Sequence, residues 1–211
     1  TLLESFKKIT KDVSLVGFDP ANNFKDLKNE SYIRINDYFN KKAFITNKLI
    51  SNKKAKIITS IAMFYDLEDP ISFAKDIFDL MEDDGIWILQ MADLPNMLLN
   101  NMFDNICHEH LTYFHIAPLE YLLKKCNLKL VNIEKNNING SSYRFFIKKD
   151  HNLITSETDL DNLNRERLFE FNLGLDTQKP FEDFKSNIQR NKNELLFFLN
   201  EEKKKGKIIL V

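Results

Sequence analysis

The sequence predicts an α/β domain built on a doubly wound, mostly parallel β-sheet. Short apolar runs with strand character alternate with amphipathic helical runs over residues 1–125. This alternation is typical of βαβ units, whose crossover helices cover the faces of a parallel sheet. Two further apolar runs follow closely in sequence and can pair as antiparallel strands at the sheet edge. Because ligands bind at the carboxyl ends of strands in this architecture, functional residues are expected directly after the strands.

The first half of the chain supplies most of the parallel strands. Apolar residues at three- and four-residue spacing predict helices at residues 1–11, 22–28 and 70–81, with a mixed helix or loop at 40–51. Strands are predicted at residues 13–17, 32–36, 56–64 and 86–91. The run at 56–64 is strongly apolar, as expected of a strand buried on both faces. Asp83–Gly85 is predicted as a turn before the strand that follows it.

The second half changes character after residue 150. A helix at 118–125 precedes two strands at 128–134 and 143–149, which are joined through a turn rich in Asn and Ser. Charged helical segments are predicted at 157–173 and 180–205, followed by an apolar strand at 207–211. We therefore expect one domain over residues 1–150 and a helical segment over 151–211. Because the chain begins within a helix and ends within an apolar run, we expect a piece of a longer polypeptide.

The composition excludes several classes of function. The formal net charge is −1 and charged residues make up 29% of the chain, so nothing favours a nucleic-acid or membrane surface. No apolar run approaches the roughly 20 residues that span a bilayer. The two cysteines, Cys107 and Cys126, cannot supply a disulfide framework, and a reducing cytoplasm is the simplest expectation.

No other window of the sequence gathers as many groups that titrate or bind metal near neutral pH as residues 104–114. Cys107, His108, Glu109 and His110 lie between apolar and aromatic neighbours, so part of the segment should be buried. A histidine beside a carboxylate can serve as a general base. Cys107, His108 and His110 also have the chemistry of zinc ligands, but three ligands so close in sequence need a distant fourth. We expect no metal here, and no acyl-transfer constellation supports a nucleophilic role for Cys107.

Polar residues follow several of the predicted strands. Asp19 comes after the strand at 13–17, where a carboxylate can accept the two vicinal hydroxyls of a ribose. Asp37 and Tyr38 follow the next strand and are candidates for adenine, although an aspartate there can also cap a helix. Ser60 and Ala62 close the strand at 56–64 and are expected under the same ligand, although strand packing also explains them.

The order of these elements resembles a class I methyltransferase that depends on S-adenosylmethionine. More specifically, Glu109–Phe114 resembles the E-H-L-x-Y-F segment of the sugar C-methyltransferase family, and Asn139–Arg144 resembles its N-G-G-S-x-R turn. The resemblance implies a nucleotide-activated keto-deoxysugar as substrate, whose products feed surface polysaccharides or glycosylated metabolites. It assigns His110 as the general base and Glu109 as a second catalytic residue. It implies that five further residues contact the substrate: Cys107, His108, Asn139, Ser142 and Arg144.

The resemblance also implies segments that this sequence does not contain. Family members carry a zinc-binding region and a glycine-rich cofactor turn before a helix like the one at residue 1. They continue into a second Rossmann-like domain after a strand like 207–211.

The chain departs from the family pattern at three positions: Phe64 replaces His, Cys107 replaces Tyr and Ser141 replaces Gly. An O- or N-methyltransferase therefore stays open as an alternative. The missing glycine-rich turn also leaves open an inactive fragment with a structural or partner-binding role.

Overall fold

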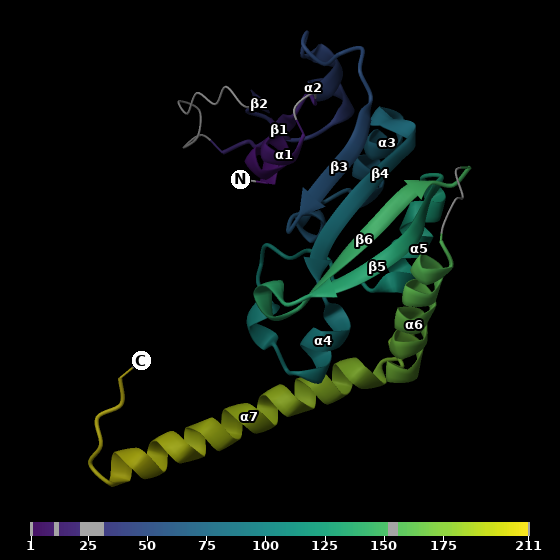
Figure 1. Ribbon diagram of the computed structural model, residues 1–211. Helices are drawn as coiled ribbons and strands as arrows, with labels where there is room; N and C mark the ends of the chain where they lie inside the picture. The colour runs from purple at the N-terminus through teal and green to yellow at the C-terminus, as the bar shows by residue number, and fades with distance from the viewer. Residues whose placement is uncertain (1, 11–12, 22–31, 152–155, 211) are drawn as a thin grey trace. The chain divides into compact units, whose positions relative to one another are not determined.

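The computed structural model describes residues 2–10, 13–21, 32–151 and 156–210 (Figure 1). The chain forms two compact units, residues 1–54 and 55–211, and each is described by itself. The helix expected at 22–28 lies outside the described residues. Alternating helices and strands form a mixed sheet, which confirms the predicted α/β class.

Unit 1 holds a parallel strand pair with one helix on either side in sequence. Its elements are α1 (Leu2–Ile9), β1 (Val16–Phe18), β2 (Ile33–Ile35) and α2 (Lys41–Thr46). Val16 pairs with Ile33, so β1 and β2 end at the same edge. A Cβ added to Gly17 would lie 3.0 Å from Leu3 Cδ1, so glycine allows α1 to approach β1 closely.

Unit 2 contains a four-stranded sheet in the order β3-β4-β6-β5. The strands are β3 (Ala55–Ile61), β4 (Met81–Ala92), β5 (Leu128–Asn136) and β6 (Ser142–Lys149). β3 runs parallel to β4, whereas β6 is antiparallel to both β4 and β5. The predicted antiparallel pair at the sheet edge is therefore confirmed. Figure 1 shows the end of β4 beside the start of β6.

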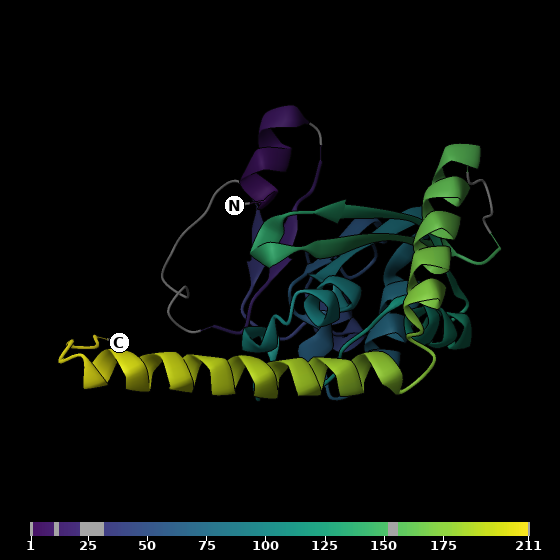
Figure 2. The ribbon, with the colours of Figure 1, turned by 90° about the horizontal axis from the view of Figure 1, so that it is seen from below.

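Helices and short 3₁₀ turns connect these strands. The helices are α3 (Pro70–Leu80), α4 (Leu94–Leu99), α5 (Ile116–Lys125), α6 (Glu157–Leu173) and α7 (Lys179–Lys204). The 3₁₀ helices are η2 (Phe64–Asp66), η3 (Phe103–Asn105) and η4 (Ile138–Gly140). Figures 1 and 2 show α6 beside β5 and α7 running on past α4. An apolar cluster that includes Leu98, Leu175 and Phe184 joins α4 to α7.

The buried face of the sheet explains why these sequences form strands. Trp87 and Leu89 of β4 and Phe145 and Ile147 of β6 alternate with less buried neighbours and are almost fully inaccessible. Such alternation places one face of each strand in the core, and each large side chain buried there contributes about 1.5–3 kcal/mol.

Three predictions about individual elements were wrong. The strand predicted at 56–64 ends at Ile61, because Ala62 adopts a left-handed φ of 53°, and β3 is only half-buried as the outer strand of its sheet. The predicted turn at 83–85 lies within β4, where a register shift against β3 accommodates extra residues. Residues 208–210 form no strand, since no neighbouring strand pairs with them among the described residues.

Candidate active site

The loop at residues 104–114 is fixed to the carboxyl end of β3 by main-chain hydrogen bonds. The carbonyl oxygen of Tyr65 accepts from the N–H of Leu111 at 3.0 Å and from the N–H of Thr112 at 3.1 Å. Tyr65 belongs to η2, which follows β3 directly. The loop therefore lies at the edge of the sheet where the parallel strands end, as the sequence predicts.

His110 is half-buried and has a defined orientation. Its ring packs edge-on against Tyr65, with ring centroids 4.4 Å apart. Its Nδ1 lies 2.9 Å from the carbonyl oxygen of Asn105, which also accepts a hydrogen bond from the hydroxyl of Tyr113 at 3.1 Å. A carbonyl oxygen can only accept, so Nδ1 carries the hydrogen. The lone pair of the neutral ring is then on Nε2, which is the atom available to act as a base.

Charged and phenolic groups surround this imidazole. Burial raises the pKa of Asp66 above its usual value, while His110 opposes that shift and Glu109 adds to it. Burial also raises the pKa of the Tyr113 hydroxyl, which therefore keeps its proton and remains a donor to Asn105. Asp66 and His110 therefore lie close enough to interact electrostatically.

Two other candidates in the loop, His108 and Glu109, are exposed to solvent. The side chains of His108 and Glu109 are 94% and 73% exposed, and the nearest approach of the pair is 4.0 Å. Cys107 is half-buried, and its carbonyl oxygen accepts from the N–H of His110 at 3.3 Å. The structure thus brings His110 together with Tyr65 and Asp66 and leaves His108 and Glu109 in solvent.

A second polar cluster crosses the sheet at the same edge. Gln90 pairs with Arg144, and Arg144 pairs with Glu134, so the three residues form one row across β4, β6 and β5. Gln90 is only 6% exposed, and its Oε1 accepts from Arg144 Nε at 3.3 Å and from Arg144 Nη2 at 3.2 Å. Arg144 Nη1 donates to Glu134 Oε2 at 3.3 Å. Asn136 Nδ2 is a third donor to Gln90 Oε1, at 3.4 Å.

The turn between β5 and β6 holds the remaining residues of the second motif. Ser142 is buried and donates its hydroxyl to the carbonyl oxygen of Ile138 at 3.0 Å. Asn139 has a φ of 51° and an exposed side chain, so it has a backbone conformation that asparagine tolerates well. Ser141 donates to Asp93 Oδ2 at 2.8 Å. Ser142 therefore stabilises the turn, whereas Asn139 and Arg144 have polar groups near solvent.

The end of β3 combines a buried serine with an unusual alanine. Trp87 Nε1 donates to Ser60 Oγ at 3.1 Å, and both side chains are buried. Ala62 is exposed, and its N–H donates to the carbonyl oxygen of Gln90 at 2.9 Å. The left-handed conformation of Ala62 thus lies next to the row that contains Arg144.

In unit 1, the predicted acids follow the ends of both strands. Asp19 is half-buried after β1, and its Oδ1 accepts from the N–H of Ala21 at 2.9 Å. Asp37 and Tyr38 are exposed after β2, and Asp37 Oδ1 accepts from the N–H of Tyr38 at 2.8 Å. Asn36 Nδ2 donates to the carbonyl oxygen of Asp19 at 2.9 Å, which ties the two strand ends together.

Sequence reasoning did not single out several residues that organise these clusters: Asn36, Tyr65, Asp66, Asn105 and Glu134. Gln90 was expected at this edge because it lies near the end of a predicted strand, but its contact with Arg144 was not. The register of β5 and β6 would have revealed Glu134. Asn105 and Tyr65 act through main-chain carbonyl groups, for which the residue type gives no signal.

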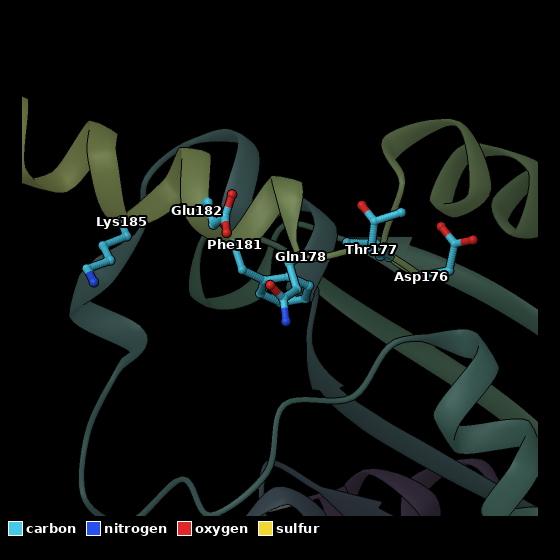
Figure 3. Close-up of a pocket in the computed structure, with 7 residues that line it drawn as sticks. Asp176, Thr177, Gln178, Phe181, Glu182 and Lys185 are labelled. Atoms are coloured by element: carbon cyan, nitrogen blue, oxygen red, sulfur yellow. The ribbon is translucent and has the colours of Figure 1, made fainter.

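A hollow of about 480 Å³ lies at the corner between α6 and α7 (Figure 3). The described residues that line it include Phe181 and Lys185 and none of the predicted site residues. The described part of the chain contains no group of three His, Cys, Asp or Glu side chains arranged to hold a metal ion. Within that part, no helix has the length and apolar character to cross a membrane.

Two family models match consecutive parts of the chain. A model described as a methyltransferase domain matches residues 1–133, and one described as a C-methyltransferase C-terminal domain matches residues 137–211. C-methyltransferase NovU of Streptomyces niveus is 27% identical over 146 residues, which are 68% of this chain and 34% of the relative. The chain thus spans about a third of the length of this curated relative.

Solved structures share the fold at low sequence identity. The plantazolicin methyltransferase BpumL, in complex with a monoazolic desmethylPZN analogue and SAH, has a TM-score of 0.50 and 14% identity, covering 70% of this chain and 71% of that chain. LepI in complex with SAM also has a TM-score of 0.50, with 10% identity over 70% of this chain and 40% of that chain.

Proposed function

Because this chain belongs to the methyltransferase domain family, we propose that its protein transfers a methyl group from S-adenosylmethionine to carbon of a nucleotide-activated keto-deoxysugar. The family accounts for the methyl donor, and the match of a C-methyltransferase C-terminal domain to residues 137–211 favours carbon as the acceptor. The relative of the same type, C-methyltransferase NovU, adds support for that choice.

Carbon needs activation before it can accept a methyl group. A ketone acidifies the hydrogen on the neighbouring carbon, and a positioned base removes it to give an enolate. The observation that carries our proposal is the contact between His110 Nδ1 and the Asn105 carbonyl oxygen at 2.9 Å. This contact leaves the lone pair of His110 on Nε2, so the ring can accept the sugar proton without a change of tautomer.

The residues around His110 support the charged state that follows proton transfer. The electron pair of the broken C–H bond remains on the substrate as the enolate, while Nε2 becomes protonated. The Asn105 carbonyl continues to accept from Nδ1, and Asp66 lies close enough to interact electrostatically with the imidazolium. When bound, S-adenosylmethionine would supply the electrophilic methyl group for the new C–C bond, with a neutral thioether as the leaving group. The imidazolium afterwards returns its proton to water.

The residues after the strands of unit 1 suit the cofactor. Asp19 has a half-buried carboxylate after β1, as ribose hydroxyls require, and Asp37 with the exposed Tyr38 ring would hold the adenine. In unit 2, Ser60 and Ala62 are further cofactor candidates, on the ground of their position at the end of β3. Asp19 supports the fit most strongly, because its carboxylate is half-buried and lies directly after β1.

Substrate contacts are assigned to residues near the edge of the unit 2 sheet. Arg144 and Asn139 would contact the nucleotide sugar directly, whereas Ser142 would keep the turn in place. The exposed Glu109, with Cys107 and His108 beside it, would contact the sugar when substrate covers the loop.

Proton exchange tests this function without requiring a complete turnover. A 4-keto nucleotide sugar is incubated with the protein and S-adenosylhomocysteine in deuterated water, and loss of the α-proton is followed by NMR. We expect exchange in the wild type and a decrease of about 10²–10⁴-fold in His110→Gln. His151→Gln, which alters an exposed histidine outside the site, is the matched control. Equal exchange in His110→Gln and wild type, or methylated product without wild-type exchange, would contradict the proposal.

A further inference from the structure

We propose that Gln90 holds Arg144 as the binding group for the diphosphate of the nucleotide-sugar substrate, and that Glu134 is a counter-ion which this diphosphate displaces. The inference rests on the proposed function for the identity of the substrate. Its geometric basis is the row Gln90–Arg144–Glu134 across three strands at the carboxyl edge of the sheet.

Gln90 orients the guanidinium through a buried acceptor. Its Oε1 accepts hydrogen bonds from both Nε and Nη2 of Arg144. These two bonds fix the orientation of the guanidinium plane. Asn136 Nδ2 donates to the same oxygen, and the main-chain carbonyl of Gln90 accepts from Ala62. Gln90 is only 6% exposed, and both its side-chain oxygen and its main-chain carbonyl accept hydrogen bonds. Its side chain is therefore fixed in place and does not move with Arg144. Gln90 therefore acts as a positioning residue, and Arg144 is the group that contacts the ligand.

Arg144 keeps donors available for a ligand. A guanidinium has five N–H groups, and three of those of Arg144 are bonded, to Gln90 twice and to Glu134 once, among the described residues. The remaining N–H groups lie on Nη1 and Nη2, the two nitrogens that present a fork to phosphate oxygens. The side chain is 37% exposed, so an anion can reach it from solvent.

Glu134 is the weak partner in the row. Its carboxylate is 49% exposed and makes one contact of 3.3 Å with Arg144. Exposed ion pairs of this kind contribute little to stability, because water and salt screen them. A diphosphate has more negative charge and more acceptor oxygens than a single carboxylate, and it can therefore replace Glu134 on Nη1. Without the ligand, Glu134 offsets the positive charge at the sheet edge.

Direct binding measurements test this assignment without using the methyl-transfer chemistry. Thymidine diphosphate, uridine diphosphate and inorganic pyrophosphate are titrated into the protein by calorimetry. Binding of all three indicates recognition of the phosphates, whereas binding of the nucleotides alone indicates an additional base contact. We expect Arg144→Gln and Gln90→Met to weaken diphosphate binding about ten- to hundredfold, because each removes or misplaces a charged hydrogen-bond donor.

The direction in which Glu134→Gln changes diphosphate affinity distinguishes this proposal from a purely structural role of Glu134. Removing the competing carboxylate should tighten diphosphate binding roughly two- to fivefold. The matched control is Glu120→Gln, which removes a carboxylate from another half-exposed arginine pair, with Arg167, and should leave binding unchanged. Thermal unfolding of each variant establishes that it is folded.

Weaker binding in Glu134→Gln, or unchanged binding in folded Arg144→Gln and Gln90→Met, would overturn the inference. Failure of the inference is separable from failure of the proposed function. Diphosphate binding through Arg144 without His110-dependent proton exchange would refute only the function, and exchange without Arg144-dependent binding would refute only the inference.

Discussion

The loop at residues 104–114 and the edge of the unit 2 sheet are held in place by different means. The loop depends on main-chain carbonyl groups. The Tyr65 carbonyl oxygen accepts hydrogen bonds from two main-chain N–H groups, and the Asn105 carbonyl oxygen accepts from the side chains of His110 and Tyr113. The sheet edge depends on side chains, through Ser60 with Trp87 and Gln90 with Arg144. Substitutions that remove side chains should therefore disturb the sheet edge, whereas the loop should respond mainly to changes in its backbone.

The largest expected effect is on the loop, from Leu111→Pro. Proline removes the N–H that donates to the Tyr65 carbonyl and restricts the backbone of His110 before it. A displacement of the base by about 1 Å can cost a hundredfold in rate, so kcat/KM for methyl transfer should fall by roughly that factor. Leu111→Ala is the matched control, because the leucine side chain is exposed and its N–H is retained. Equal losses in both variants would show that the side chain, rather than the backbone, places the loop.

A smaller effect is expected at the sheet edge, from Ser60→Ala. This change leaves the buried indole N–H of Trp87 without its acceptor, which should lower the free energy of unfolding by about 1–3 kcal/mol. Urea denaturation measures the loss, with Ser72→Ala as a control because that serine is exposed on α3. Because Ser60 is also a cofactor candidate, KM for S-adenosylmethionine separates the two roles. A loss of stability with unchanged KM would remove Ser60 from the cofactor residues, whereas a large rise in KM with unchanged stability would show that its main role is in cofactor binding.

The smallest effect is expected at Asp66→Asn, in the turn that anchors the loop. Burial raises the pKa of Asp66, so ionisation destabilises the folded state. The wild-type free energy of unfolding therefore falls as pH rises from the unfolded pKa of about 3.9 through the folded pKa. The variant has no carboxyl group to ionise at this position, so its free energy of unfolding should be slightly higher than that of the wild type at neutral pH. This difference should disappear in acid, where Asp66 is protonated in both the folded and the unfolded wild type. Denaturation curves at several pH values measure the difference, and an advantage that grows in acid would contradict the assignment.

The sequence predicted the fold because its signals are periodic and local. The apolar spacing predicted the helix at 70–81, which α3 confirms, and the two late strands paired as expected. Asp69 caps this helix by accepting from the N–H of Ser72. The strand predicted through Phe64 was wrong because nothing in the sequence marks Ala62 as left-handed. The family match likewise confirms the methyltransferase class that the order of the elements predicted.

The candidate site could be predicted only in part. His110 and Arg144 were identified from motifs, yet the groups that orient them are a main-chain carbonyl of Asn105 and a buried Gln90. The first has no sequence signature, and the second depends on strand register that the sequence does not specify. The exposed positions of His108 and Glu109 also could not be foreseen, since both share a segment with the half-buried His110.

The tautomer of His110 tests the central claim most directly. Long-range ¹H–¹⁵N correlation spectra of the ligand-free protein at a pH where the ring is neutral report which ring nitrogen carries hydrogen, with His110→Gln identifying the signals. We predict hydrogen on Nδ1, bonded to the Asn105 carbonyl, and an unprotonated Nε2. Hydrogen on Nε2 would contradict the account, because the nitrogen proposed to accept the sugar proton would then have no free lone pair.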